Sequence, residues 1–212
     1  GVDYLEKAIA EVEKDDRFKY QHGIQTNLVN FNQETDRWVN LYKTKFNNTL
    51  GVSWDFGIRH LKKSGTQNLE KANKDFEDIF WANIKLTQEN ELDLYMVVTF
   101  TKLFAKHYTN PLEFFQLMRD KGIKKVNFER VTKTGMAREY WEELGLNNLE
   151  YANAMSRFFK AYIFFKQKNP EVDLSVSPFD GLLESVLTLR MNKKQQEVKT
   201  AVWDILSYKN QG

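Results

Sequence analysis

The stretch MSRFFKAYIFFKQKNP, residues 155–170, places five aromatic side chains among four basic ones. Each residue advances about 100° around an α-helix, and at that spacing most of these aromatic and basic side chains separate onto opposite faces. The arc opposite the aromatic side chains carries Arg157, Lys160 and Lys168. The pattern therefore predicts a central helix with a wide apolar face in the core and its basic side chains in solvent.

Phe164 is the exception to this separation, because its position falls on the basic face between Arg157, Lys160 and Lys168. An exposed phenylalanine beside three cations calls for a partner. The ring either packs against a neighbouring helix or subunit, or stacks on a nucleic-acid base that the cations hold. Both alternatives stay open at the level of the sequence.

The composition favours helices over short strands. The chain has 212 residues, 42% of them apolar, with only ten glycines and three prolines. Such sparse turn formers are typical of long helices rather than of many strands joined by tight turns. The absence of cysteine excludes disulfides, thiolate nucleophiles and thiolate zinc sites from these residues.

Start signals for helices recur along the chain. Asn110-Pro111 and Ser177-Pro178 each join a capping residue to a proline at the first helical position, and Asn147 or Asn148 caps the opening helix. Thr66 and Thr87 predict further helices over about 67–86 and 88–107. We therefore predict an all-α fold, a single irregular domain of about eight or nine helices. Two of them, including 88–107, are central, and at most a small β-ribbon forms near 123–131 or 172–176.

The domain prediction is one helical domain over residues 1–212. An N-terminal subdomain, 1–109, and a C-terminal subdomain, 110–212, packed together are the alternative. The chain begins without methionine, so we expect a fragment of a longer protein. No apolar run approaches the length needed to span a bilayer. We expect a soluble protein without membrane insertion, inside the cell and in the cytoplasm.

Motifs for chemistry are scarce. His22, His60 and His107 are the only histidines, and no two of them lie at metal-ligand spacing. The sequence holds no glycine-rich phosphate loop and no serine nucleophile motif. We therefore predict a protein that is not an enzyme and has no metal site and no cofactor.

Our main functional prediction is a non-catalytic module for protein interaction or self-assembly. Besides Phe164, Trp81 is a candidate partner-binding residue, because it falls opposite the apolar face of its helix, among charged residues. Packing of the Trp81 ring under a loop is the equal alternative. Acidic segments at 1–16 and 70–93 and basic segments at 119–138 and 157–168 favour association between copies. The expected partner is another protein or a second copy of the chain.

The alternative is a nucleoprotein-like module that binds single-stranded RNA or DNA with little regard to sequence, through a basic groove. Phosphates would contact cationic side chains, while Phe164 or Tyr140 stacks on bases. The cationic candidates are Lys124, Lys125, Arg130, Lys133, Arg138, Arg157, Lys160 and Lys168.

Overall fold

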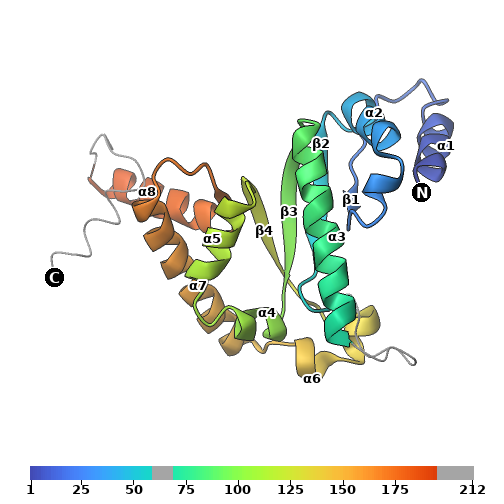
Figure 1. The fold of residues 1–212 in the computed structure, drawn as a ribbon. Coiled ribbons are helices and arrows are strands. Elements are labelled where there is room, and N and C mark those ends of the chain that lie inside the picture. Colours follow the sequence, from blue (N-terminus) through green and yellow to red (C-terminus); the bar gives the residue numbers. More distant parts are fainter. Residues whose placement is uncertain (59–68, 195–212) are drawn as a thin grey trace. The chain divides into compact units, whose positions relative to one another are not determined.

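The computed structural model describes residues 1–58 and 69–194 (Figure 1). The helix predicted over 193–208, the Thr66 cap and His60 fall outside these residues, apart from 193 and 194. The chain divides into two compact units, Gly1–Val98 and Thr99–Gly212, and each is described by itself.

The first unit contains three α-helices and three parallel strands within its described residues. Its elements are α1 (Val2–Val12), β1 (Gln25–Thr26), the 3-10 helix η1 (Phe31–Gln33), α2 (Thr35–Lys45), β2 (Thr49–Trp54), α3 (Leu69–Glu89) and most of β3 (Asp93–Phe100). The second unit takes up the end of β3. It continues with α4 (Lys102–His107), α5 (Leu112–Asp120), β4 (Lys125–Arg130), the 3-10 helix η2 (Gly135–Arg138), α6 (Trp141–Leu144), α7 (Asn148–Lys168), β5 (Ser175–Ser177) and α8 (Phe179–Lys194).

The prediction of an all-α fold is wrong. The strands belong to a five-stranded sheet in the order β1-β2-β3-β4-β5. Within the first unit β1 pairs parallel to β2 and β2 parallel to β3, and within the second β4 pairs parallel to β5. Helices alternate with these strands along the chain, so the fold is of the α/β class.

The predicted central helix over 88–107 is the main error. Residues 93–100, DLYMVVTF, form strand β3, and only Lys102–His107 is helical, as α4. Val97, Val98 and three other side chains of the strand are buried, and a strand buried on both faces gives a continuous apolar run. Such a run has no period that separates it from a buried helix.

Thr87 also has a different role from the one predicted. It does not begin a helix: it lies inside α3, buried, and its hydroxyl donates to the Ile84 carbonyl at 2.7 Å. The chain leaves α3 at Glu91, which has a left-handed φ of 59°, and the Leu92 amide bonds back to the Thr87 carbonyl at 3.1 Å. This closure ends the helix and turns the chain into β3.

The strands of the first unit have one face towards the helices. Trp54 at the end of β2 meets Trp81 of α3 edge to face, with ring centroids 5.1 Å apart, and Figure 1 shows α3 running alongside β2 and β3. The side chains of this face are all buried: Leu50, Val52, Trp54, Leu94, Met96 and Val98. The opposite face carries the alternate side chains, which include Gln25, Ser53 and Tyr95.

An aromatic cluster forms the core of the second unit. Phe158 of α7 is fully buried, with ring centroids 5.1 Å from Phe100, 5.5 Å from Phe104 and 5.6 Å from Phe128. The α7 helix begins as predicted, with a capping box in which the Asn147 side chain accepts from the Glu150 amide. The predicted β-ribbon segments are present, but as the parallel strands β4 and β5.

Among the described residues, no helix combines the length and the apolar character that crossing a bilayer requires.

A glycine substitution tests the strand assignment. A Cβ at Gly51 of β2 would lie 2.5 Å from the Tyr95 hydroxyl and 2.9 Å from the Ile24 carbonyl oxygen of the neighbouring chain segment. We expect Gly51→Ala to lower the free energy of unfolding by about 1–3 kcal/mol through this overpacking. Gly23→Ala, which meets no atom within 4 Å, is the control and should stay within about 0.5 kcal/mol of the wild type in urea denaturation. Equal effects would contradict the packing of Tyr95 over β2.

The packing of α3 also predicts a pH dependence. Burial raises the pKa of the Glu77 carboxyl above its ordinary 4.5, although the nearby Trp54 side chain opposes the shift. The folded state therefore favours protonated Glu77, and its contribution to stability is present below pH 4.5 and lost as the pH rises through the folded pKa. We expect Glu77→Gln to be more stable than the wild type at pH 7, with the difference vanishing in acid. Glu89→Gln, at an exposed site, should show no such trend.

Candidate functional site

The polar face of the first unit is the first candidate site. The Gln25 side-chain amide donates to the Ser53 hydroxyl at 2.6 Å, which joins β1 to β2 near their carboxyl ends. Tyr95 of β3 is opposite Gly51 in the register, and its hydroxyl lies over that glycine because no Cβ intervenes. Open parallel sheets bind ligands outside the carboxyl ends of their strands. We name Gln25, Ser53 and Tyr95 the polar row.

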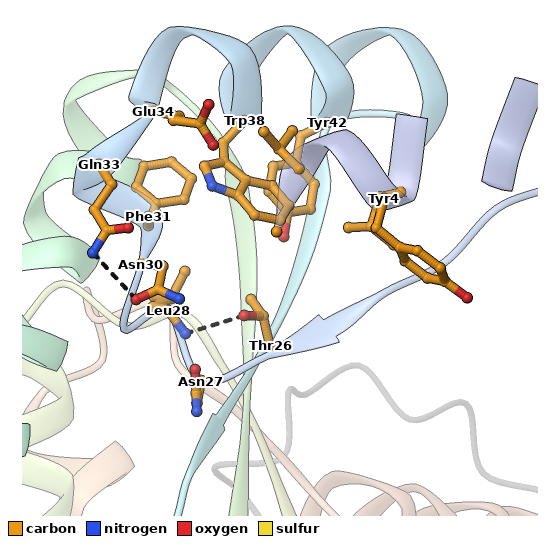
Figure 2. A pocket seen from close by; sticks show the side chains of 13 residues that line it. Tyr4, Thr26, Asn27, Leu28, Asn30, Phe31, Gln33, Glu34, Trp38 and Tyr42 are labelled. Carbon is orange, nitrogen blue, oxygen red and sulfur yellow. Dashed lines mark hydrogen bonds between the residues drawn. The ribbon is translucent and has the colours of Figure 1, made fainter. Parts of the chain in front are cut away.

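A cavity of about 360 Å³ lies beside strand β1, on the side of that strand that faces the helices. Thr26 borders it, whereas its neighbour Gln25 points to the other face of β1. Figure 2 shows the rings of Phe31, Trp38 and Tyr42 gathered at this cavity and Tyr4 pointing away from them. The further lining residues are Gly1, Val2, Leu5, Asn27, Leu28, Asn30, Gln33 and Glu34.

The loop that follows β1 forms one wall of the cavity. Leu28 adopts a left-handed φ of 60°, which costs free energy for a residue other than glycine. The conformation is held from both sides: the Leu28 amide donates to the Thr26 hydroxyl at 3.2 Å, and the Leu28 carbonyl accepts from Asn83 at 2.7 Å. Asn83 is itself buried within α3, so a helix distant in sequence fixes this wall.

Tyr42 is one of the residues around the cavity, and its hydroxyl is closed off from solvent. Its side chain is fully buried, and the hydroxyl oxygen has no hydrogen-bond partner among the described residues. Burial raises the pKa of the Tyr42 phenol well above its ordinary value, so the group stays protonated and can both donate and accept.

A second hollow, of about 420 Å³, lies in the second unit where β5 meets α8. The Asp180 carboxylate accepts from the Ser175 hydroxyl at 2.7 Å and from the Val176 amide at 2.8 Å, and the Tyr162 hydroxyl lies 2.7 Å away. Burial, followed by Asp180, raises the pKa of the Tyr162 phenol. These bonds hold β5 to the start of α8, and we assign them a structural role.

The two predicted partner-binding aromatics have different surroundings. Phe164 is 48% exposed, as the helical pattern predicts, and the Lys168 ammonium lies 5.7 Å from its ring centroid. Trp81 is half-buried and packs edge to face against Trp54 and Phe80. Part of Trp81 is covered because a strand that was not predicted lies on this side of α3, and its partner-binding role stays a prediction.

The predicted nucleic-acid side chains lie in separate parts of the second unit. Lys124 and Lys125 are exposed at the amino end of β4, and Arg130 is at its carboxyl end, about 16 Å away at the usual rise of a strand. Lys133 lies 5.8 Å from the ring of Trp141, in the loops after β4 that also hold Arg138 and Tyr140.

On α7, Arg157 donates to the carbonyls of Ala105 and Thr109 at 3.3 Å each. Lys160 is exposed on the same helix, and Lys168 lies beside Phe164. The binding roles of all these residues stay predictions.

The comparisons with known proteins bear on the fold. No protein-family model and no curated protein matches the sequence. Solved structures of anSMEcpe with bound AdoMet do match. Native anSMEcpe with bound AdoMet has a TM-score of 0.61 and 20% identity, covering 88% of this chain and 49% of that one. The form with AdoMet and the Kp18Cys peptide has a TM-score of 0.60, also at 20% identity, covering 89% and 49%. The chain thus spans about half the length of the structures it matches.

These matches correct the functional prediction. At 20% identity the likeness shows the fold alone, and that fold is not the all-α architecture on which the interaction module and its RNA-binding alternative rested. The matched structures hold bound AdoMet, so the shared fold gives no support to a non-catalytic interaction module. The predictions of a non-catalytic module and of a protein that is not an enzyme are therefore wrong.

No local pattern of residues indicates the polar row. Gln25 and Ser53 are 28 residues apart, and both fall in segments that resemble connections between helices. The alternation of Leu50, Val52 and Trp54 is the one local signal for β2.

A substitution at Arg130 tests whether this side chain has a structural role or the predicted nucleic-acid-binding role. Its guanidinium donates to the Asn148 side chain at 2.8 Å and to the Leu146 carbonyl at 2.6 Å, and it lies 4.8 Å from the ring centroid of Tyr151. A lysine side chain, with a single ammonium group, cannot reproduce the planar arrangement of donors that the guanidinium provides. We expect Arg130→Lys to lower the free energy of unfolding by about 1–2 kcal/mol. Arg138→Lys, at an exposed position, should leave it unchanged in the same denaturation experiment; a neutral Arg130→Lys would argue against the structural role.

Proposed function

We propose that the chain forms part of an enzyme that binds AdoMet, and that the polar row holds the amino-acid end of that molecule. The observation that carries the proposal is the Gln25–Ser53 pair, which lies near the carboxyl ends of parallel strands. The support from comparison is the fold shared with AdoMet-bound structures. The Kp18Cys peptide is bound in the anSMEcpe structure, and we assign no peptide to this chain.

The hydrogen-bonding capacity of the pair fits an α-amino acid. Ser53 uses its oxygen to accept from Gln25, so its own proton is available to a carboxylate. Gln25 uses one amide proton and keeps its carbonyl oxygen, which can accept from an ammonium group. One donor and one acceptor therefore stand side by side, as a zwitterion requires. Tyr95 borders them on the same face with a half-buried phenol.

When bound, AdoMet supplies a sulfonium whose carbon–sulfur bonds are activated for cleavage. The residues of this chain bind and orient its polar end. The 212 residues contain no cysteine, so they offer no thiolate to a metal cluster. The proposal includes an intracellular, cytoplasmic location.

The test is calorimetric titration of AdoMet into the protein. We expect binding, and we expect Gln25→Ala and Ser53→Ala each to weaken it about five- to tenfold, the worth of a hydrogen bond of about 1–1.4 kcal/mol. Adenosine, which lacks the amino-acid end, should bind the variants and the wild type alike. Asn40→Ala, at an exposed site on α2, is the control. No binding of AdoMet, or variants that bind it as the wild type does, would refute the proposal.

A further inference from the structure

We propose that Tyr95 of β3 recognises the positively charged sulfur of AdoMet through the face of its ring. This contact makes the site prefer AdoMet to S-adenosylhomocysteine, the neutral thioether that lacks one methyl group. The inference rests on the proposed function, in which Gln25 and Ser53 hold the amino-acid end of AdoMet, and it adds a specificity-determining residue to that same site. Three observations support it: the position of the ring, its lack of other partners and the charges of the strands.

The Tyr95 side chain extends from β3 over the neighbouring strand β2. A Cβ at Gly51 would lie 2.5 Å from the Tyr95 hydroxyl oxygen and 2.7 Å from the ring carbon that bears it. Gly51 is opposite Tyr95 in one register and opposite Gln25 in the other. The tip of the ring is therefore one strand spacing, about 4.8 Å, from the backbone of Gln25, on the same face as the Gln25–Ser53 pair.

Tyr95 is the aromatic side chain that this face offers to a ligand. Among the described strand residues of the first unit the only other aromatic one is Trp54, which is buried on the helix face. Tyr95 is half-buried, so part of its ring stays accessible. In AdoMet two methylene groups join the α-carbon to the sulfur, so a molecule held at Gln25 and Ser53 carries its positive charge close to that pair.

The Tyr95 ring has no polar or aromatic partner of its own. No hydrogen bond, ring contact or cation contact involves it among the described residues. Tyr151 in the second unit shows the contrast, because the Arg130 guanidinium lies 4.8 Å from its ring centroid. The face of an aromatic ring attracts a cation through its quadrupole, and binding of ligand cations is a known use of such rings. Tyr95 can therefore make this contact with a ligand.

The strands around Tyr95 carry no positive charge. Asp93 is the single charged side chain of β1, β2 and β3, and it lies two residues before Tyr95. Because alternate side chains of a strand share a face, Asp93 and Tyr95 point to the same side. A cation beside the ring therefore meets an attractive carboxylate on these strands, and no ammonium or guanidinium that would repel it.

The contact separates AdoMet from its neutral analogue. The two molecules have the same amino-acid end, so the hydrogen bonds of Gln25 and Ser53 hold both alike. The ring adds an attraction for the sulfonium alone, and a cation–π contact at a partly exposed site corresponds to about three- to tenfold in affinity.

The experiment is calorimetric titration of AdoMet and of S-adenosylhomocysteine into the wild type and three variants. Tyr95→Leu removes the ring, Tyr95→Phe keeps it, and Tyr4→Leu makes the same change at an aromatic side chain that is 74% exposed on α1. We expect the wild type, Tyr95→Phe and Tyr4→Leu to prefer AdoMet about three- to tenfold. Tyr95→Leu should lose that preference through weaker binding of AdoMet, while its affinity for the neutral analogue changes less than about twofold.

The outcomes separate this inference from the proposed function. An equal preference in Tyr95→Leu and the wild type, a wild type without preference, or a loss of preference in Tyr95→Phe overturns the inference and leaves AdoMet binding in place. A wild type that binds neither ligand overturns both. Loss of the preference in Tyr95→Leu with unchanged binding by Gln25→Ala and Ser53→Ala supports the ring contact and overturns only the assignment of the pair. Tyr95→Val, which suits a strand, replaces Tyr95→Leu if thermal unfolding shows that the leucine variant is not folded.

Discussion

Burial of alternate side chains along β2 and β3 determines which residues of the first unit lie on each face of these strands. Leu50, Val52 and Trp54 must face the helices, because each is almost wholly removed from water. Because successive side chains of a strand point to opposite faces, Ser53 and Gly51 then lie on the other face. The parallel register then brings Gln25 and Tyr95 beside them. The polar row is thus a consequence of packing on the opposite side of the strand.

The second unit depends on the same principle with larger side chains. Phe158 contacts rings contributed by β3, α4 and β4, so one residue of α7 unites elements far apart in the chain. This central position is what the helical pattern of 155–170 predicts, and the capping box at Asn147 is predicted by its local sequence. Local information suffices here because a helix is defined by contacts within a few residues.

The sheet could not be derived in the same way. Strand β3 reads as a continuous apolar run, and β2 and β1 are short. Parallel pairing depends on partners that are tens of residues apart, so no local signal reports it. The same limit applies to the candidate sites. Gln25 and Ser53 meet only through the register, and Tyr42 resembles any other core aromatic until the neighbours of its hydroxyl are known. Phe164 was predictable because its exposure follows from the face of one helix, whereas Trp81 is covered by a strand.

The bond between Asn83 and the Leu28 carbonyl has a consequence for any ligand in the cavity. A loop free to move must lose conformational entropy when it closes on a ligand, and that loss is subtracted from the affinity. Here the left-handed turn at Leu28 is already held by a buried amide of α3 at 2.7 Å. The ordering of this wall is completed during folding rather than during binding. The cavity is therefore preorganised on that side, and a small molecule can gain affinity there from few contacts.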